Sequence, residues 1–268
     1  DPLFEDGIGA DLKQESVRFA QESVFGATGT FNELLTASFT YGNSRIRDIY
    51  GSDVLAAPQS ESSDTWGRIE LDPTHRAGLL TQIGFLAANA EGTLPNSIMR
   101  GVHISQRVLC VDLPPPPDMI PPFPELSPDQ TNRERVETLT GDPACAACHA
   151  GLINPLGFAL EKLDGFGQYR DLENDRPIDA SATYNLDGAP VSYDGAVQFS
   201  QALANSQQAH DCYSRRWAEY LYGRDFDPGV VGDRNLIVQG GALSKGGALV
   251  QNLMVQLIAT DAVLSRLP

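Results

Sequence analysis

The chain has 268 residues, of which 41% are hydrophobic, so it can bury a substantial core as one large domain or two closely packed lobes. Its 35 acidic and 19 basic side chains give a net charge of −16, which opposes binding to nucleic acid or to an anionic membrane surface. A cationic partner, or simply high solubility, fits such a surface. The longest apolar runs fall short of the roughly 18 residues that a membrane helix needs, so no membrane span is expected.

The first 110 residues predict four amphipathic helices. Thr30 and Glu33 stand three residues apart, as in a capping box at the start of a helix. Pro95 suits the first turn of a later helix, because the amide hydrogen that proline lacks has no partner there. The predicted helices cover residues 12–25, 30–38, 74–88 and 95–109.

A proline-rich segment follows these helices. Residues 113–124 read Leu-Pro-Pro-Pro-Pro-Asp-Met-Ile-Pro-Pro-Phe-Pro. Such a run lacks amide donors and has fixed backbone angles, so it can form neither a helix nor an interior strand. We expect a stiff polyproline strap across the surface of the protein, and the alternative is a ligand for a proline-recognition module.

The second half of the chain predicts more helices around a small β hairpin. Asp187-Gly188 and Asp194-Gly195 are turn pairs within residues 167–195, where short strands are expected. The fold class is therefore mainly α, with a small β hairpin and a long polyproline strap. The predicted helices of this half cover residues 131–140, 208–222 and 247–258.

The motif with the clearest chemistry is Asp142-Pro-Ala-Cys145-Ala-Ala-Cys148-His149. Two cysteines three residues apart on a helical turn can reach the two vinyl groups of one haem, and the next residue then presents its imidazole to the iron. Asp142 as N-cap and Pro143 as first helical residue begin that turn where it is needed. We predict one covalent haem c in a cytochrome-c-like helical domain, with Cys145 and Cys148 as thioether anchors and His149 as proximal ligand.

Two other interpretations of these cysteines are weaker. A redox dithiol does not need His149, and a zinc site needs a second Cys or His pair at metal spacing, which the isolated Cys110 and Cys212 do not supply. Covalent haem attachment belongs to the periplasm or the cell exterior, where leftover cysteines usually pair. We therefore expect a disulfide between Cys110 and Cys212, with two buried free thiols as the alternative.

Several motifs together resemble the planctomycete-type cytochrome c family, whose members are large secreted bacterial proteins built from consecutive domains of unknown function. The resemblance implies a secreted haem-c protein without an established reaction. It also implies that this chain, which begins at Asp1 without a methionine, is the C-terminal portion of a longer architecture. The specific motifs are Arg76-Ala-Gly-Leu-Leu-Thr81, Arg100-Gly101, Leu109-Cys110 with Pro114–Pro117, the haem motif, Leu152–Glu161, Asp164–Arg170 and Ile178–Ser181; similarity continues through Cys212, Leu221–Arg224 and Gly246–Arg266.

The distal iron ligand decides between an electron carrier and a reaction centre, because a thioether there blocks substrate and an open position admits it. Met99 is our first choice, since Met99 and His103 share one face of the predicted 95–109 helix. Met119, in the strap, and His103 are the next candidates. The remaining residues, expected in the core or at solvated ends, are Met254, His75 and His210.

Other residues are candidates for contacts around the haem. A backbone carbonyl at Asn154-Pro155 could accept a hydrogen bond from the imidazole Nδ1, or these residues could simply break the helix. Arg100, Tyr169 and Arg170 are candidates for hydrogen bonds to the haem propionates, with surface ion pairing as the alternative.

The sequence thus predicts a secreted monohaem c-type cytochrome domain that transfers single electrons. Its redox partner is expected to be a cationic protein or the missing N-terminal part of the same precursor. A haem peroxidase or oxygenase with an open distal site, and a haem-stapled structural module of a larger assembly, are the alternatives. We expect an N-terminal helical segment at residues 1–70, which is the end of a preceding domain. The haem c-binding domain is expected at 71–190, and a C-terminal helical domain packed on it at 191–268.

Overall fold

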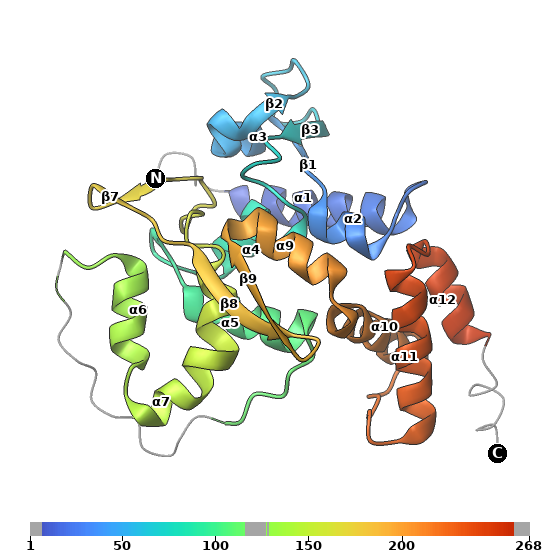
Figure 1. The fold of residues 1–268 in the computed structure, drawn as a ribbon. Coiled ribbons are helices and arrows are strands. Elements are labelled where there is room, and N and C mark those ends of the chain that lie inside the picture. The colour runs from blue at the N-terminus through green and yellow to red at the C-terminus, as the bar shows by residue number, and fades with distance from the viewer. Residues whose placement is uncertain (1–6, 116–126, 128, 260–268) are drawn as a thin grey trace.

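A computed structural model describes residues 7–115, 127 and 129–259 (Figure 1). Helices dominate, and the strands form small antiparallel sheets, in agreement with the mainly α prediction. The helices are α1 (Ile8–Phe25), α2 (Phe31–Thr36), α3 (Ser44–Tyr50), α4 (Ile83–Ala88), α5 (Ser97–His103), α6 (Asn132–Thr140), α7 (Pro143–Cys148), α8 (Asn154–Phe158), α9 (Gly195–Asn205), α10 (Gln207–Tyr222), α11 (Val231–Lys245) and α12 (Val250–Ile258).

In the part of the chain that the structure describes, the strands form one three-stranded sheet, in the order β1-β3-β2, and three two-stranded pairs. The strands are β1 (Phe39–Gly42), β2 (Val54–Ala56), β3 (Gly67–Leu71), β4 (Ala90–Glu91), β5 (Leu94–Pro95), β6 (Leu172–Glu173), β7 (Arg176–Pro177), β8 (Ser181–Leu186) and β9 (Ala189–Asp194). The described residues also contain single turns of 3-10 or π type: η1 (Gly51–Asp53), η2 (Leu79–Thr81), η3 (Ile104–Val108) and η4 (His149–Ile153).

The predicted hairpin is confirmed as β8–β9. Its six residue pairs run from Ser181–Asp194 to Leu186–Ala189. Asp187 and Gly188 form the turn and both have positive φ, +55° and +81°, as a tight two-residue hairpin turn requires. α9 and α11 are helices that our sequence analysis did not predict.

Two of the predicted N-terminal helices are shorter than expected. In the expected helix at 74–88, helical structure begins only after Gly78, which has φ +59° and lies so close to the backbone of Leu35 that no side chain would fit. Gln82, with extended backbone angles, then separates η2 from α4. The expected helix at 95–109 begins two residues later. Pro95 belongs to β5, and Asn96 caps α5 by accepting from the N–H of Met99 at 3.0 Å.

Buried side chains of the described residues form three hydrophobic clusters. The N-terminal one joins α1, α3 and β3, the C-terminal one joins α10, α11 and α12, and the largest lies between them. This central cluster takes residues from all three predicted domains, for example Phe19, Leu156 and Phe199. The division at residues 70 and 190 stays a prediction.

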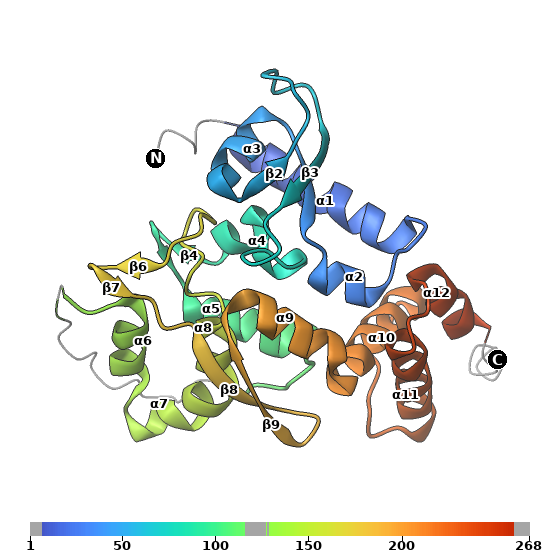
Figure 2. The ribbon, with the colours of Figure 1, turned by 45° about the horizontal axis from the view of Figure 1, so that its top comes forward.

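The C-terminal helices and the haem motif lie at opposite sides of the molecule. Figures 1 and 2 both show α6 and α7 at one side and α11 and α12 at the other, with the β8–β9 hairpin and α9 between them. The predicted disulfide is present: Cys110, after η3, bonds to Cys212 of α10, with Cα atoms 5.4 Å apart. Within the described residues, none of the helices combines the length and the apolar character needed to span a membrane.

Candidate functional site

The helical segment that carries the motif begins as the sequence predicts. Asp142 caps α7, its Oδ1 accepting from the N–H of Ala144 at 2.9 Å, and Pro143 occupies the first turn. α7 continues without a break through η4 into α8. His149 therefore opens a wider π-type turn, a feature that is frequent at functional sites.

Cys145, Cys148 and His149 lie at the surface. All three are half-buried, no residue of α7 is buried, and the two cysteines are not bonded to each other. The three side chains do not converge as the ligands of a bare metal ion would, since the described residues contain no group of three His, Cys, Asp or Glu side chains able to hold one. The arrangement is therefore unlike a closed zinc site.

A chain of hydrogen bonds fixes the ring of His149. The hydroxyl of Thr140 donates to the carbonyl of Val136 at 2.7 Å, so its oxygen accepts from Nδ2 of Asn154, 2.9 Å away. The amide of Asn154 is thereby oriented with Oδ1 toward His149 Nδ1, at 3.1 Å. Nδ1 must carry the hydrogen, and Nε2 keeps its lone pair for a metal.

The residues present fit a c-type haem. Two unpaired thiols precede a histidine, and the nitrogen of that histidine that is left free for the iron is Nε2. Our sequence analysis chose the right residue, Asn154, but the wrong atom: the acceptor is its side-chain oxygen and not a backbone carbonyl.

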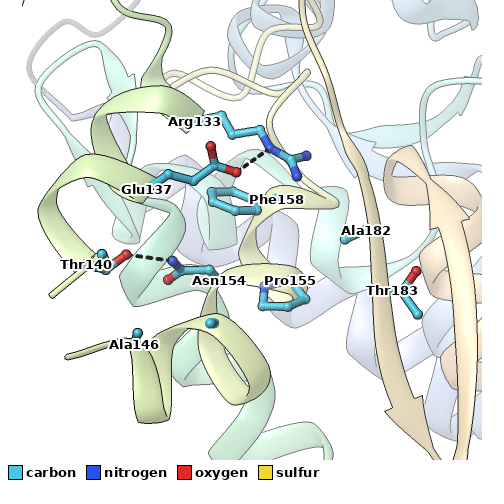
Figure 3. Close-up of a pocket in the computed structure, with 11 residues that line it drawn as sticks. Arg133, Glu137, Thr140, Ala146, Asn154, Pro155, Phe158, Ala182 and Thr183 are labelled. Atoms are coloured by element: carbon cyan, nitrogen blue, oxygen red, sulfur yellow. Dashed lines mark hydrogen bonds and ion pairs between the residues drawn. The ribbon is translucent and has the colours of Figure 1, made fainter. Parts of the chain in front are cut away.

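A cleft of about 270 Å³ lies beside this segment, between α6, α8 and β8 (Figure 3). Arg133 stands at one end, paired with Glu137 at 3.0 Å and lying over the ring of Phe158 at 4.5 Å. Thr140 and Asn154 also line the cleft, whereas the three motif side chains do not. The cleft therefore borders the hydrogen bonds that orient His149 and is lined by a different face of the helix from the cysteines.

Arg100 has a structural role in this conformation. It is completely buried, and its guanidinium donates to the backbone carbonyls of residues 86, 89, 160, 163 and 164 at 2.6–3.3 Å. Burial lowers the pKa of Arg100 to about 10, so the group remains charged at neutral pH. With all its N–H groups engaged, it has no donor for a propionate.

Tyr169 and Arg170 also make contacts away from the motif. The ring of Tyr169 stacks on His75 with centroids 3.5 Å apart. Arg170 pairs with Glu173 at 3.3 Å. Among the described residues, these contacts do not bring either side chain to His149, and the propionate role stays a prediction for both.

The distal candidates are dispersed. Met99 is 46% exposed on α5 and His103 is also exposed, while Met119 lies outside the described residues. Met254 is partly buried in α12. His210 is not a solvated end as predicted: it is fully buried, with Nδ1 2.7 Å from Ser244 Oγ and Nε2 2.9 Å from the carbonyl of Ala204.

His75, also expected at a solvated helix end, is hydrogen-bonded to another residue of the protein. Its Nδ1 lies 2.8 Å from Asp53 Oδ1, and Asp53 also accepts from Nε of the buried Arg76 at 2.6 Å. The histidine therefore belongs to a partly buried ion-pair group at the edge of the N-terminal cluster.

Our sequence analysis missed a buried polar group that positions α6. The carboxylate of Glu161 accepts from the hydroxyl of Ser97 and from Nδ2 of Asn132, the latter at 3.1 Å to each oxygen. Burial raises the pKa of this carboxyl. The signal in the sequence was a lone acidic residue in the apolar stretch 156–163. These bonds join α5, α6 and the turn that follows α8, so they also hold Val136 and Thr140 in place.

The described structure is mainly α, and one of its surface helices presents an oriented histidine after two unpaired cysteines. Residues 76–173 match the family PSCyt3, described as a protein of unknown function (DUF1588). That segment belongs to this planctomycete cytochrome-type domain family, which confirms the family expected from the sequence. No curated protein and no solved structure matches the chain.

Proposed function

We propose that this protein is a monohaem c-type cytochrome that transfers single electrons. Cys145 and Cys148 anchor the haem through thioethers, and His149 is the proximal ligand. The observation that carries the proposal is the orientation of His149 by Asn154 and Thr140, which leaves Nε2 available. A haem held there supplies a one-electron iron couple, and the protein holds the ring of its ligand in one orientation and one tautomer.

The direct test is covalent attachment after expression with a cytochrome c maturation system. Acid-acetone extraction should leave the haem on the protein, and the intact mass should show one haem per chain. The Cys145→Ala, Cys148→Ala double variant serves as the control and should lose its haem to the solvent. A wild-type mass equal to that of the bare polypeptide would refute the proposal.

We propose Met99 as the distal ligand, with His103 and Met119 next. In that case the ferric protein is six-coordinate and low-spin, with a weak near-infrared sulfur-to-iron band that Met99→Ala abolishes. An unchanged spectrum in Met99→Ala would move the assignment to His103 or Met119.

A haem peroxidase or oxygenase is the second candidate function. The exposure of both Met99 and His103 favours it, because neither side chain is held in place by burial, as a fixed second ligand would be. A high-spin ferric spectrum with rapid reaction toward peroxide would select this function over electron transfer.

We also propose a cellular compartment and a kind of redox partner for this protein. Covalent haem c and the Cys110–Cys212 disulfide both suit the periplasm or the cell exterior. The net charge of −16 suits a cationic redox partner. Steep loss of the electron-transfer rate with rising salt would support the cationic partner.

A further inference from the structure

A cleft beside the Cys110–Cys212 disulfide gathers three arginine side chains. The cleft has a volume of about 260 Å³, and its lining includes Arg107, Arg215 and Arg216. The chain as a whole carries a net charge of −16, so this cluster is opposite in sign to the molecule around it. It lies outside the haem motif and plays no part in the proposed electron transfer.

The disulfide brings the two walls of the cleft together. Arg107 precedes Cys110 by three residues in η3, and Arg215 and Arg216 follow Cys212 by three and four residues on α10. Residues three and four apart share a helix face, so both arginines lie on the side of α10 that faces the bond. Nη2 of Arg216 donates to the carbonyl of Gln106 at 2.7 Å, which ties the walls a second time.

The positive charge of the cleft is only partly compensated. Glu219 accepts from Nε of Arg215 and from Nη1 of Arg216, both at 2.8 Å. Asp112 lines the cleft but forms no ion pair with a described residue, and the exposed Arg107 forms none either. Three guanidinium groups therefore face two carboxylates.

The donors of these arginines are also in excess. Nε of Arg216 is buried and has no acceptor among the described residues. Arg107 and the terminal nitrogens of Arg215 add further N–H groups without a protein acceptor in the part of the chain that the structure describes. Guanidinium forks match the oxygen spacing of phosphate-like groups and bind them through charge-assisted hydrogen bonds.

We propose that this cleft is a binding site for a small tetrahedral oxyanion, phosphate or sulfate, either free or as the ester group of a small molecule. The volume fits such a group and is too small for a folded partner. The negative charge of the anion offsets the excess of one positive charge, and its oxygens supply acceptors for the unused N–H groups.

Calorimetric titration of the full-length, disulfide-intact protein tests the site. Inorganic phosphate and sulfate should bind saturably, whereas chloride at equal ionic strength should not. Arg107→Gln should weaken phosphate binding at least tenfold, which one lost charge-assisted contact accounts for. Because Arg107 is exposed and has no ion pair with a described residue, the variant should unfold at the wild-type temperature in the absence of phosphate.

Arg47→Gln, which removes one positive charge from α3, is the matched control and should bind phosphate as the wild type does. Equal loss of binding in both arginine variants, or no saturable binding in the wild type, would overturn the site. Methyl phosphate separates the two sources. Affinity equal to that of inorganic phosphate supports recognition of an ester group, and much weaker binding supports the free ion.

Discussion

At the scale of single residues, Asn154 connects the haem motif to α6. Its amide bonds both to the ring of His149 and to Thr140, and the hydroxyl of Thr140 is held by its own helix. An acceptor at Nδ1 makes the imidazole a stronger donor to iron and so favours the ferric state. The orientation of one amide should thus influence the redox potential.

Replacing Thr140 by Val removes the acceptor that orients this amide. In the haem-loaded protein we expect a higher midpoint potential, by roughly 60 mV, the equivalent of a tenfold change for one electron. Potentiometric titration measures it. Thr138→Val is the matched control, because the hydroxyl of Thr138 donates to the carbonyl of Glu134 on the same helix and is not bonded to Asn154 in the described structure. Equal shifts in both variants would contradict the role of the amide.

Glu15 gives a pH dependence to the stability of the N-terminal cluster. Its carboxyl is fully buried, accepting from Tyr50 at 2.5 Å and Thr40 at 3.0 Å, and desolvation raises its pKa from 4.5 to about 7. The folded state therefore holds this proton more tightly than the unfolded state does. The free energy of unfolding should fall by about 3 kcal/mol as the pH rises from 4.5 to 7 and then stay low.

Glu15→Gln should remove this part of the pH dependence, because an amide cannot ionise. Denaturant unfolding at pH 5 and pH 8 would show a smaller difference in the variant than in the wild type. Glu22→Gln, on the same helix, should leave the wild-type difference unchanged. A variant with the full wild-type dependence would show that another group is responsible.

At the scale of elements, the position of the motif depends on how closely α5 approaches η4 and α8. A Cβ at Gly101 would overlap the carbonyl oxygen of Ile153, and one at Gly157 would overlap that of Ser97. Such contact needs glycine on the approaching surfaces and leaves no room for a methyl group. The crossing holds the segment that follows His149 against the interior.

Gly101→Ala should therefore destabilise the protein by about 1–3 kcal/mol or more, the usual cost of overpacking. Gly151→Ala is the contrasting change, because nothing lies within 4 Å of a Cβ there, and it should stabilise by about 0.5–1 kcal/mol through higher helix propensity. Thermal unfolding compares the two variants. Similar effects of the same sign would contradict the close crossing.

At the scale of the whole molecule, the disulfide joins the segment after α5 to the C-terminal helices. It closes a loop across a sequence separation of 102 residues. Chain entropy predicts that the Cys110→Ala, Cys212→Ala double variant loses about 4–5 kcal/mol of unfolding free energy. Denaturant titration measures the loss, and alkylation of the denatured, unreduced wild type should leave both cysteines unlabelled. Labelling of Cys110 and Cys212 would show that the disulfide is absent, and the expected loss of unfolding free energy would then not apply.

The sequence alone predicted the features that local chemistry determines. The spacing of Cys145, Cys148 and His149, the cap at Asp142 and the turn at Asp187-Gly188 each depend on neighbouring residues, and the last two are confirmed. The haem attachment itself stays a prediction. The helices at 131–140, 208–222 and 247–258 were also found, since their apolar spacing or capping signals are local.

Tertiary structure decided what depends on residues distant in the chain. From its charge alone, Arg100 was expected to pair with an anionic group, but in the fold its guanidinium is surrounded by backbone carbonyls of residues between 86 and 164. His210 was expected at a solvated helix end, but α11 buries it against Ser244. The side-chain acceptor on His149, the arginine cleft and the division of the 74–88 helix likewise arise from contacts between separate segments. A single sequence does not display such contacts, because burial and hydrogen-bond partners are properties of the packed chain.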